Sequence, residues 1–131
     1  MANVLALKPF VPSGPDFSRA LAFFSDLGFA AVWESDGYAE LRLGNAAFIL
    51  QRFDDAHVQN NLMMSVEVDD LDDWYRHILS SGVLERYGVI AKPPARYPWG
   101  QREVHLIDPA GVCWHFVQAA DRNPGTTGPA G

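Results

Sequence analysis

The sequence predicts an α+β domain built from two copies of a β-α-β-β-β unit. The first observation is a pair of matching helical segments, "DFSRALAFFSDLG" at residues 16–28 and "DLDDWYRHILSSG" at residues 70–82, each running from an Asp to a Gly. The second is a pair of similar strand-like segments, "GNAAFILQ" at residues 44–51 and "GVCWHFVQ" at residues 111–118, which share their first and last residues. Similar segments in the same order in both halves indicate an internal repeat.

Both helical segments are amphipathic and have defined ends. Asp16 and Asp70 can accept hydrogen bonds from the free backbone N–H groups of a first helical turn, while Gly28 and Gly82 permit a left-handed exit. Apolar residues recur at helical spacing, so each helix has one face that must pack on a sheet. These faces comprise Phe17, Ala20, Leu21, Phe24 and Leu27 in the first helix, and Leu71, Trp74, Tyr75, Ile78 and Leu79 in the second.

Strand-like segments surround the two predicted helices in the same arrangement. We expect one strand before each helix and three after it, with turns that contain Gly, Asn or Asp between them. The second half carries an insertion with three prolines, which favours an irregular edge strand or loop there. The expected strands are residues 4–11, 29–35, 38–43 and 46–51, then 62–68, 90–97, 102–107 and 113–118.

At 131 residues the chain is long enough for one domain with a substantial core and too short for two ordinary domains. We expect a single domain over residues 1–122, with module one at 4–52 and module two at 62–119. Residues 53–61 between them are polar and lack an apolar period, so we interpret them as a flexible linker. Residues 123–131 are rich in Gly, Pro and Thr, and we expect a flexible tail.

Composition and charge exclude several classes of partner. There are 16 acidic residues against 10 Lys and Arg, and the formal charge of −6 disfavours nucleic acid and anionic membranes. Cys113 is the single cysteine, so no intrachain disulfide can form, which favours a reducing compartment. The N-terminus lacks a basic start followed by a long apolar run, and no stretch is long enough to span a membrane. We therefore expect a cytoplasmic protein.

Two stretches, "RALAFFSDLGF" at residues 19–29 and "PWGQREVHLIDPAGVCWHFVQ" at residues 98–118, carry a resemblance to a known family. With the paired β-α-β-β-β units, they resemble the glyoxalase, bleomycin-resistance and extradiol-dioxygenase superfamily, and the later stretch is most similar to the bleomycin-resistance branch. The resemblance implies a curled eight-stranded mixed sheet around a cavity, and a homodimer with two ligand crevices at the subunit interface. Pro9 interrupts strand pairing, so we expect it to mark an N-terminal arm that bends or exchanges between subunits.

By the same resemblance, superfamily enzymes take metal ligands from the first and last strands of each module. The matching positions in this sequence lie near Leu7 or Lys8, at Phe48, near Met63 and at His115. Only His115 has a common metal-ligating side chain, whereas a catalytic metal needs about three protein ligands. We therefore expect no metal and no cofactor.

The other histidines and the cysteine do not change this expectation. If residues 108–111 form a four-residue turn, Val104 pairs with His115 and His105 pairs with Trp114. Strand alternation then places the two histidines on opposite faces of the sheet. We also expect solvated side chains at His57 and His77, a small core residue at Cys113, and no catalytic residue.

The cavity is then interpreted as a binding pocket, lined by residues that alternate along its strands. Its lining is apolar with a few polar points and suits a partly aromatic ligand, with Glu67 available to a cationic group. By resemblance, Trp99 in the "PWG" loop stacks on a planar moiety, although Trp33, Tyr38 and Trp99 could equally be core or dimer contacts. The expected ligand-binding residues are Trp33, Tyr38, Phe48, Leu50, Met63, Ser65, Glu67, Trp99, Arg102 and His115.

The leading hypothesis is a metal-free, homodimeric protein that binds a small molecule and sequesters it without chemistry. The resemblance makes bleomycin-type antibiotics the named ligand. One alternative is a metal-dependent lyase, isomerase or dioxygenase of the same superfamily with a displaced metal site. Another is an interaction module whose cavity is vestigial.

Overall fold

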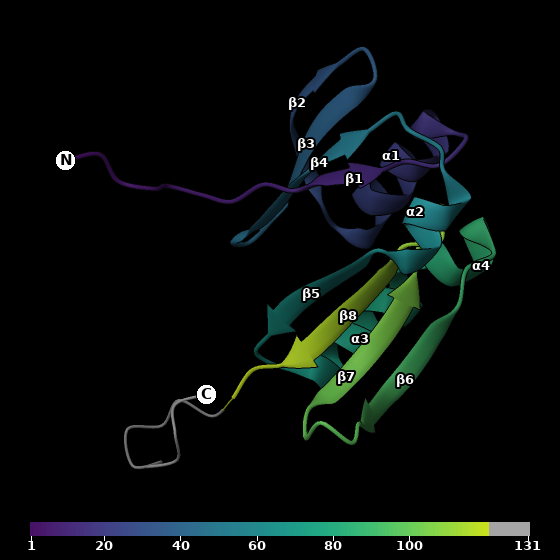
Figure 1. Cartoon of the computed structure of the whole chain (residues 1–131). Helices are drawn as coiled ribbons and strands as arrows, with labels where there is room; N and C mark the ends of the chain where they lie inside the picture. Colours follow the sequence, from purple (N-terminus) through teal and green to yellow (C-terminus); the bar gives the residue numbers. More distant parts are fainter. Residues whose placement is uncertain (121–131) are drawn as a thin grey trace.

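A computed structural model describes residues 1–120, and the tail expected at residues 123–131 lies outside the described residues. Two β-α-β-β-β modules follow one another along the chain, as predicted, and Figure 1 shows the first module above the second. The α+β fold class is therefore confirmed. The elements are β1 (Phe10–Pro12), α1 (Phe17–Leu27), β2 (Ala30–Ser35), β3 (Tyr38–Leu43), β4 (Ala46–Gln51), α2 (Ala56–Asn61), β5 (Met63–Val68), α3 (Leu71–Ser81), α4 (Val83–Tyr87), β6 (Ala91–Arg96), β7 (Arg102–Ile107) and β8 (Cys113–Gln118).

Each module contributes one four-stranded mixed sheet. The strand orders are β1-β4-β3-β2 and β5-β8-β7-β6, so the eight predicted strands form two hydrogen-bonded sheets of four. In each sheet the strand before the helix runs parallel to the last strand of the module, and the other neighbours are antiparallel. β6 is an edge strand with an irregular register between Lys92 and Ala95, as the intervening prolines predict.

The two long helices have the ends that the sequence predicts. The side chains of Asp16 and Asp70 accept hydrogen bonds from backbone N–H groups of the first turn, at 2.9 and 3.0 Å. Gly28 and Gly82 end the helices with positive φ angles of 125° and 80°, a region that disfavours side chains with a Cβ. Both helices have 11 residues, and no helix within residues 1–120 is long and apolar enough to cross a membrane.

Three segments differ from the sequence-based expectation. β1 begins only after Pro9, and residues 1–7 project away from the body as an exposed N-terminal arm (Figure 1). The expected linker contains α2, which is capped by Asp55 and anchored by the buried Gln59. The proline-rich insertion begins with α4, whose five residues follow the glycine at the end of α3. These two helices are too short for a periodic pattern to be recognised in the sequence.

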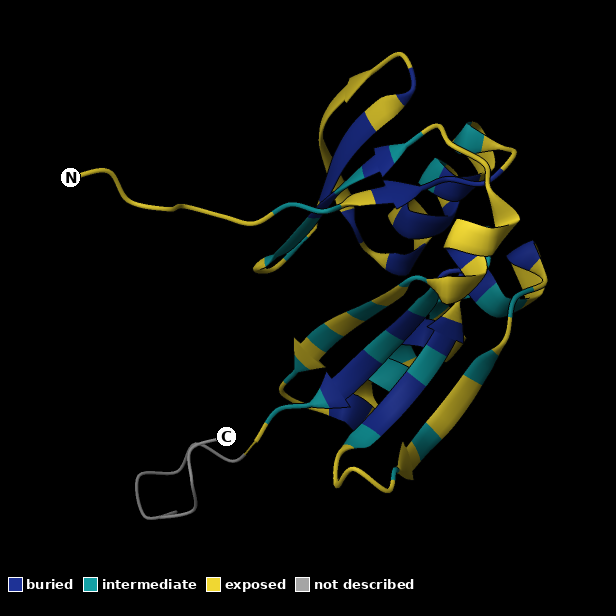
Figure 2. Ribbon diagram, in the orientation of Figure 1, coloured by how far each residue is buried: buried dark blue, intermediate teal, exposed yellow. Residues whose placement is uncertain are grey.

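One continuous core joins the two modules. Phe24 of α1 packs on Phe48 of β4, with ring centroids 5.0 Å apart, and on Trp114 of β8, at 5.3 Å. Trp74 of α3 packs on Phe116 of β8, so each long helix covers one face of its own sheet. The opposite face of each sheet, called the open face below, has no helix packed on it within residues 1–120. Figure 2 shows that the middle strands of the second sheet, β8 and β7, are more buried than its outer strands, β5 and β6, and that β2 is the most exposed strand of the first sheet.

His77 is half-buried and makes specific contacts, whereas the sequence led us to expect a solvated side chain. Its Nε2 atom lies 2.6 Å from the backbone oxygen of Leu27, and its ring stacks on Trp74 with centroids 4.8 Å apart. The histidine thus connects α3 to the end of α1. The sequence could not predict this contact, because His77 and Leu27 lie 50 positions apart.

Asp108 organises the turn between β7 and β8. It is 3 % exposed, and Oδ1 accepts hydrogen bonds from the backbone N–H groups of the three residues at 110–112, at 2.9 to 3.0 Å. Oδ2 accepts a hydrogen bond from Trp114 Nε1 at 2.9 Å. Burial raises the pKa of the Asp108 carboxyl from 3.8 to about 6, although these four donors oppose the shift.

Candidate functional site

The register of β7 and β8 differs from the predicted one by one residue. His105 pairs with His115, and Val104 pairs with Phe116. The predicted four-residue turn is wrong, because five residues, 108–112, lie between the last pair, Ile107 and Cys113. A shift of one residue moves every side chain of one strand to the other face. The two histidines therefore lie on the same face, and their ring centroids are 4.0 Å apart.

Glu103 lies at the centre of the open face of the second sheet. Its side chain is 4 % exposed, and Oε2 accepts a hydrogen bond from Trp99 Nε1 at 2.6 Å. Oε1 accepts hydrogen bonds from His105 Nε2 at 2.8 Å and from His115 Nδ1 at 3.0 Å. Burial raises the pKa of Glu103, but the hydrogen bonds from Trp99 and the two histidines outweigh it and hold the pKa below 4.5. The group is thus a carboxylate at neutral pH.

Four rings form a column along this open face. Trp99 stacks on Tyr97 with centroids 4.9 Å apart and an interplanar angle of 17°, and Tyr97 stacks on His105 at 4.5 Å and 21°. The His115 ring contacts the His105 ring, with centroids 4.0 Å apart, and forms the inner end of the column. Trp99 is 58 % exposed, so the outer end of this ring column is at the surface. A planar aromatic group could extend the stack there, because the indole is already held by its bond to Glu103.

The first sheet repeats the pairing of a buried glutamate with a tryptophan. Glu40 has a side chain that is 5 % exposed, and Oε1 accepts hydrogen bonds from Trp33 Nε1 and Lys8 Nζ, both at 3.0 Å. Arg42 lies 3.5 Å from Oε2. The hydrogen bond from Lys8 holds the pKa of Glu40 below its ordinary value against the effect of burial. Each open face thus presents a tryptophan fixed by a carboxylate beneath it.

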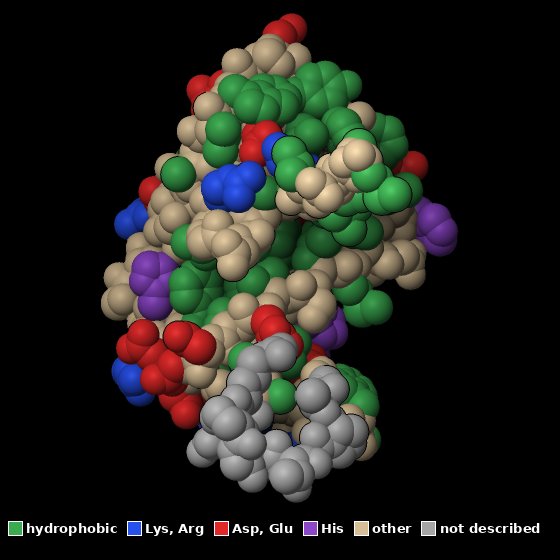
Figure 3. Space-filling view, turned by 90° about the vertical axis from the view of Figure 1, so that its left-hand side faces the viewer, with side chains coloured by type: hydrophobic (Ala, Val, Ile, Leu, Met, Phe, Trp, Pro, Cys, Tyr) green, Lys and Arg blue, Asp and Glu red, His purple; other side chains and the backbone are tan. Residues whose placement is uncertain are grey.

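Tyr38 and three residues of β5 lie on these open faces. Tyr38 is 39 % exposed and contacts Phe10 edge-on, and Met63 and Ser65 line a cavity of about 160 Å³ beside His115. Glu67 alternates with them along β5 and lines a separate cavity of about 410 Å³ between the modules. Acidic residues 69, 70 and 73 line this second cavity too, and Figure 3 shows acidic side chains gathered beside apolar ones on the side from which the N-terminal arm projects. That these residues bind a ligand stays a prediction.

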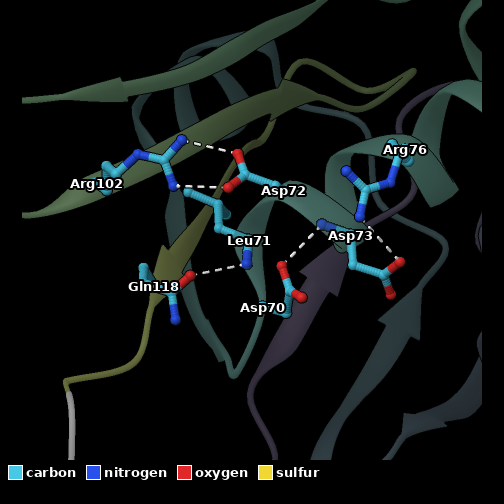
Figure 4. Close-up of polar contacts among 7 residues, drawn as sticks. All are labelled: Asp70, Leu71, Asp72, Asp73, Arg76, Arg102 and Gln118. Atoms are coloured by element: carbon cyan, nitrogen blue, oxygen red, sulfur yellow. Dashed lines mark hydrogen bonds and ion pairs between the residues drawn. The ribbon is translucent and has the colours of Figure 1, made fainter.

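Phe48, Leu50 and Arg102 do not lie where the sequence-based prediction put them. Phe48 and Leu50 are 2 % and 0 % exposed and belong to the core on the helix side of the first sheet. The guanidinium group of Arg102 makes two hydrogen bonds with the carboxylate of Asp72 at the start of α3, at 2.8 and 3.3 Å (Figure 4). Arg102 faces the helices because the assumed register of β7 and β8 was wrong by one residue. Phe48 and Leu50 do so because the alignment of residues 44–51 with residues 111–118 did not predict their face.

The positions that hold a metal in superfamily enzymes do not fit one here. Lys8 is committed to Glu40, and Phe48 is buried against α1. Of these positions only His115 carries an imidazole, which is too few strong ligands for a catalytic metal, and we derive no metal-dependent step from this set. Cys113, expected in the core, instead lies half-buried on the open face with His115, and burial raises the pKa of its thiol.

Glu103, His105 and Tyr97 were missed as site residues. Glu103 and His105 are two residues apart on one strand, so they share a face. The sequence does not show that this face is the one that also carries His115. Glu40 in the first module was missed for the same reason. Glutamate in a strand is usually exposed to solvent, so the sequence alone does not indicate that these two glutamates are buried.

The chain belongs to the glyoxalase/bleomycin resistance protein/dioxygenase superfamily, whose family model matches residues 10–116. Within this superfamily it is 30% identical to a bleomycin resistance protein of Klebsiella pneumoniae over 117 residues, which cover 84% of this chain and 89% of the relative. The crystal structure of a bleomycin-binding protein complexed with bleomycin is also similar, with a TM-score of 0.77, 26% identity, and coverage of 89% of this chain and 100% of that one.

A second solved structure supports the fold. It is a bleomycin-binding protein from bleomycin-producing Streptomyces verticillus complexed with copper(II)-bleomycin, at a TM-score of 0.74 and 24% identity. The similarity covers 92% of this chain and 100% of that one. The fold that the sequence resemblance implied is thereby confirmed.

Proposed function

We propose that this protein binds a bleomycin-type antibiotic and confers resistance by sequestering it, without changing it chemically. The observation that carries the proposal is the exposed Trp99, held by Glu103 at the end of the ring column, in a chain 30% identical to a bleomycin resistance protein. A planar, partly aromatic ligand would stack on the indole, and a cationic part of it would be attracted to the acidic residues near Glu67.

Titration with bleomycin, followed by intrinsic tryptophan fluorescence, tests this proposal. We expect saturable quenching with a dissociation constant of about 1 µM or lower, because the indole of Trp99 would be covered by the ligand. The titration is done with metal-free and copper(II)-loaded drug. An absence of saturable change up to about 100 µM drug in both forms would contradict antibiotic binding.

The complete crevice is proposed to form between two copies of the chain. Val4, Leu5 and Leu7 of the N-terminal arm are 88 to 95 % exposed, and Phe10 and Met63 on the open faces are 56 % and 66 % exposed. A second copy would cover these exposed apolar side chains of the arm and the open faces. The ligand would then contact an open face from each subunit.

Sedimentation velocity tests this assembly. We expect a dimer at about 10 µM protein, and a shift to monomer when residues 1–7 are deleted, because these residues belong to no strand in the described part of the chain and are free to pair with a second copy. The deletion leaves β1 intact, so unchanged circular dichroism serves as the control for folding. A monomer for the full chain at this concentration would remove the dimer from the proposal.

A further inference from the structure

We propose that His105, Cys113 and His115 together bind one soft or borderline transition-metal ion, copper or zinc, on the open face of the second sheet. One ring nitrogen of each histidine and the Sγ atom of Cys113 lie within 4.8 Å of one another. Ligand atoms around a tetrahedral ion with bonds of about 2.0 to 2.3 Å are about 3.3 to 3.8 Å apart. Small side-chain rotations therefore bring the three donors to bonding distance.

The strand register fixes this triad. His105 pairs directly with His115 across β7 and β8, and Cys113 lies two residues before His115 on the same face. Two donors come from one strand and the third from its hydrogen-bonded neighbour, so the sheet itself sets their spacing. These are different positions from those that match metal ligands of superfamily enzymes, of which the triad shares only His115.

Glu103 orients the two imidazoles as a carboxylate commonly does beside a metal. Its Oε1 atom accepts from His105 Nε2 and His115 Nδ1, at 2.8 and 3.0 Å. With those nitrogens protonated, the opposite nitrogens, Nδ1 of His105 and Nε2 of His115, carry lone pairs that can coordinate an ion. Tyr97 stacks on His105 and restricts its ring further. Glu103 and Tyr97 thus restrict the orientation of the two rings before any ion arrives.

The chemistry of the donors selects the class of ion. A thiolate with two imidazoles favours copper or zinc, whereas magnesium and calcium require oxygen ligands. Met63 pairs with Cys113 across β5 and β8 and adds a thioether on the same face. The cavity of about 160 Å³ beside His115 leaves room for a further, exchangeable ligand on the ion. This site goes beyond antibiotic sequestration, which requires no ion bound to the protein.

Titration of the full chain with Co²⁺ and Zn²⁺, in a non-thiol reductant and without any antibiotic, tests the site. We expect one equivalent of Zn²⁺ per chain by calorimetry, and an intense near-ultraviolet thiolate-to-cobalt absorption band with Co²⁺. Cys113→Ser should abolish the band, and Cys113→Ser and His115→Ala should each weaken Zn²⁺ binding at least about tenfold. Mg²⁺ should not bind.

His57→Ala is the matched control, because His57 is an exposed histidine on α2, outside the triad. It should bind Zn²⁺ like the unchanged chain. The proposal is overturned if no ion binds, or if binding survives both replacements within the triad. Because no drug is present, this result is independent of the bleomycin titration, and either proposal can fail alone.

Discussion

Replacing Trp99 with alanine should weaken the binding of bleomycin about ten- to a hundred-fold, the range typical of an aromatic anchor in a binding interface. Trp99 is 58 % exposed and lies at the outer end of the ring column, so its removal takes away the stacking surface without opening the core. Fluorescence of the remaining tryptophans or calorimetry measures the change in affinity. Trp99→Phe should lose less affinity, because it keeps an aromatic face on Tyr97 while it loses the hydrogen bond to Glu103.

Ile90→Ala is the control for a general effect of removing exposed apolar surface. Ile90 is 70 % exposed but lies in the cavity formed with Arg19 and Tyr87, away from the ring column. Its replacement should leave bleomycin affinity unchanged. If Trp99→Ala binds bleomycin as tightly as the unchanged chain, the indole is a structural or dimer contact, and the ligand lies elsewhere on the open faces.

The helices were predictable because their signals are local. Asp16 and Asp70 act as caps, and Gly28 and Gly82 end the helices, through contacts within a few residues of the chain. The same holds for the edge character of β6, which follows from its two prolines. The short α2 and α4 gave no periodic pattern, and their positions depend on long-range contacts such as that of Gln59 with Ala110.

It was harder to predict which side chains of each strand face the helices, because an error of one residue in the register reverses the answer. The similarity between residues 44–51 and 111–118 aligned Phe48 with His115, but Phe48 faces α1 and His115 lies on an open face. The turn before β8 is one residue longer than assumed, and Asp108 fixes that length by binding the N–H groups of residues 110–112. Sequence alternation alone could not supply this turn geometry.

The same shift explains why the site was only partly predicted. Trp33, Tyr38 and Trp99 were predicted as candidate ligand contacts, because a large aromatic side chain near a turn is itself a sign of a binding or packing role. Glu103 and His105 were not, because their importance lies in mutual contacts that appear only when β7 and β8 are paired. The proposed metal triad likewise depends on His105 and His115 sharing a face.

Protonation of Asp108 should make the free energy of unfolding depend on pH with a defined sign. The folded-state pKa of about 6 lies above the ordinary value of 3.8, so the folded chain holds this proton more tightly than the unfolded chain. Its contribution to stability is fully present below pH 3.8 and is lost as the pH rises through about 6, a total of about 3 kcal/mol. Urea unfolding at several pH values between 4 and 7 measures it.

Asp108→Asn isolates this contribution, because asparagine cannot ionise but keeps a carbonyl oxygen for the three backbone donors of the turn. Glu40 and Glu103, whose pKa values are lowered, act in the opposite direction, since their stabilisation is lost as the pH falls. They are present in both proteins, so they cancel in the difference. The variant should therefore lack the decline between pH 4 and 6. An identical pH profile in both proteins would show that the proton is bound by another group.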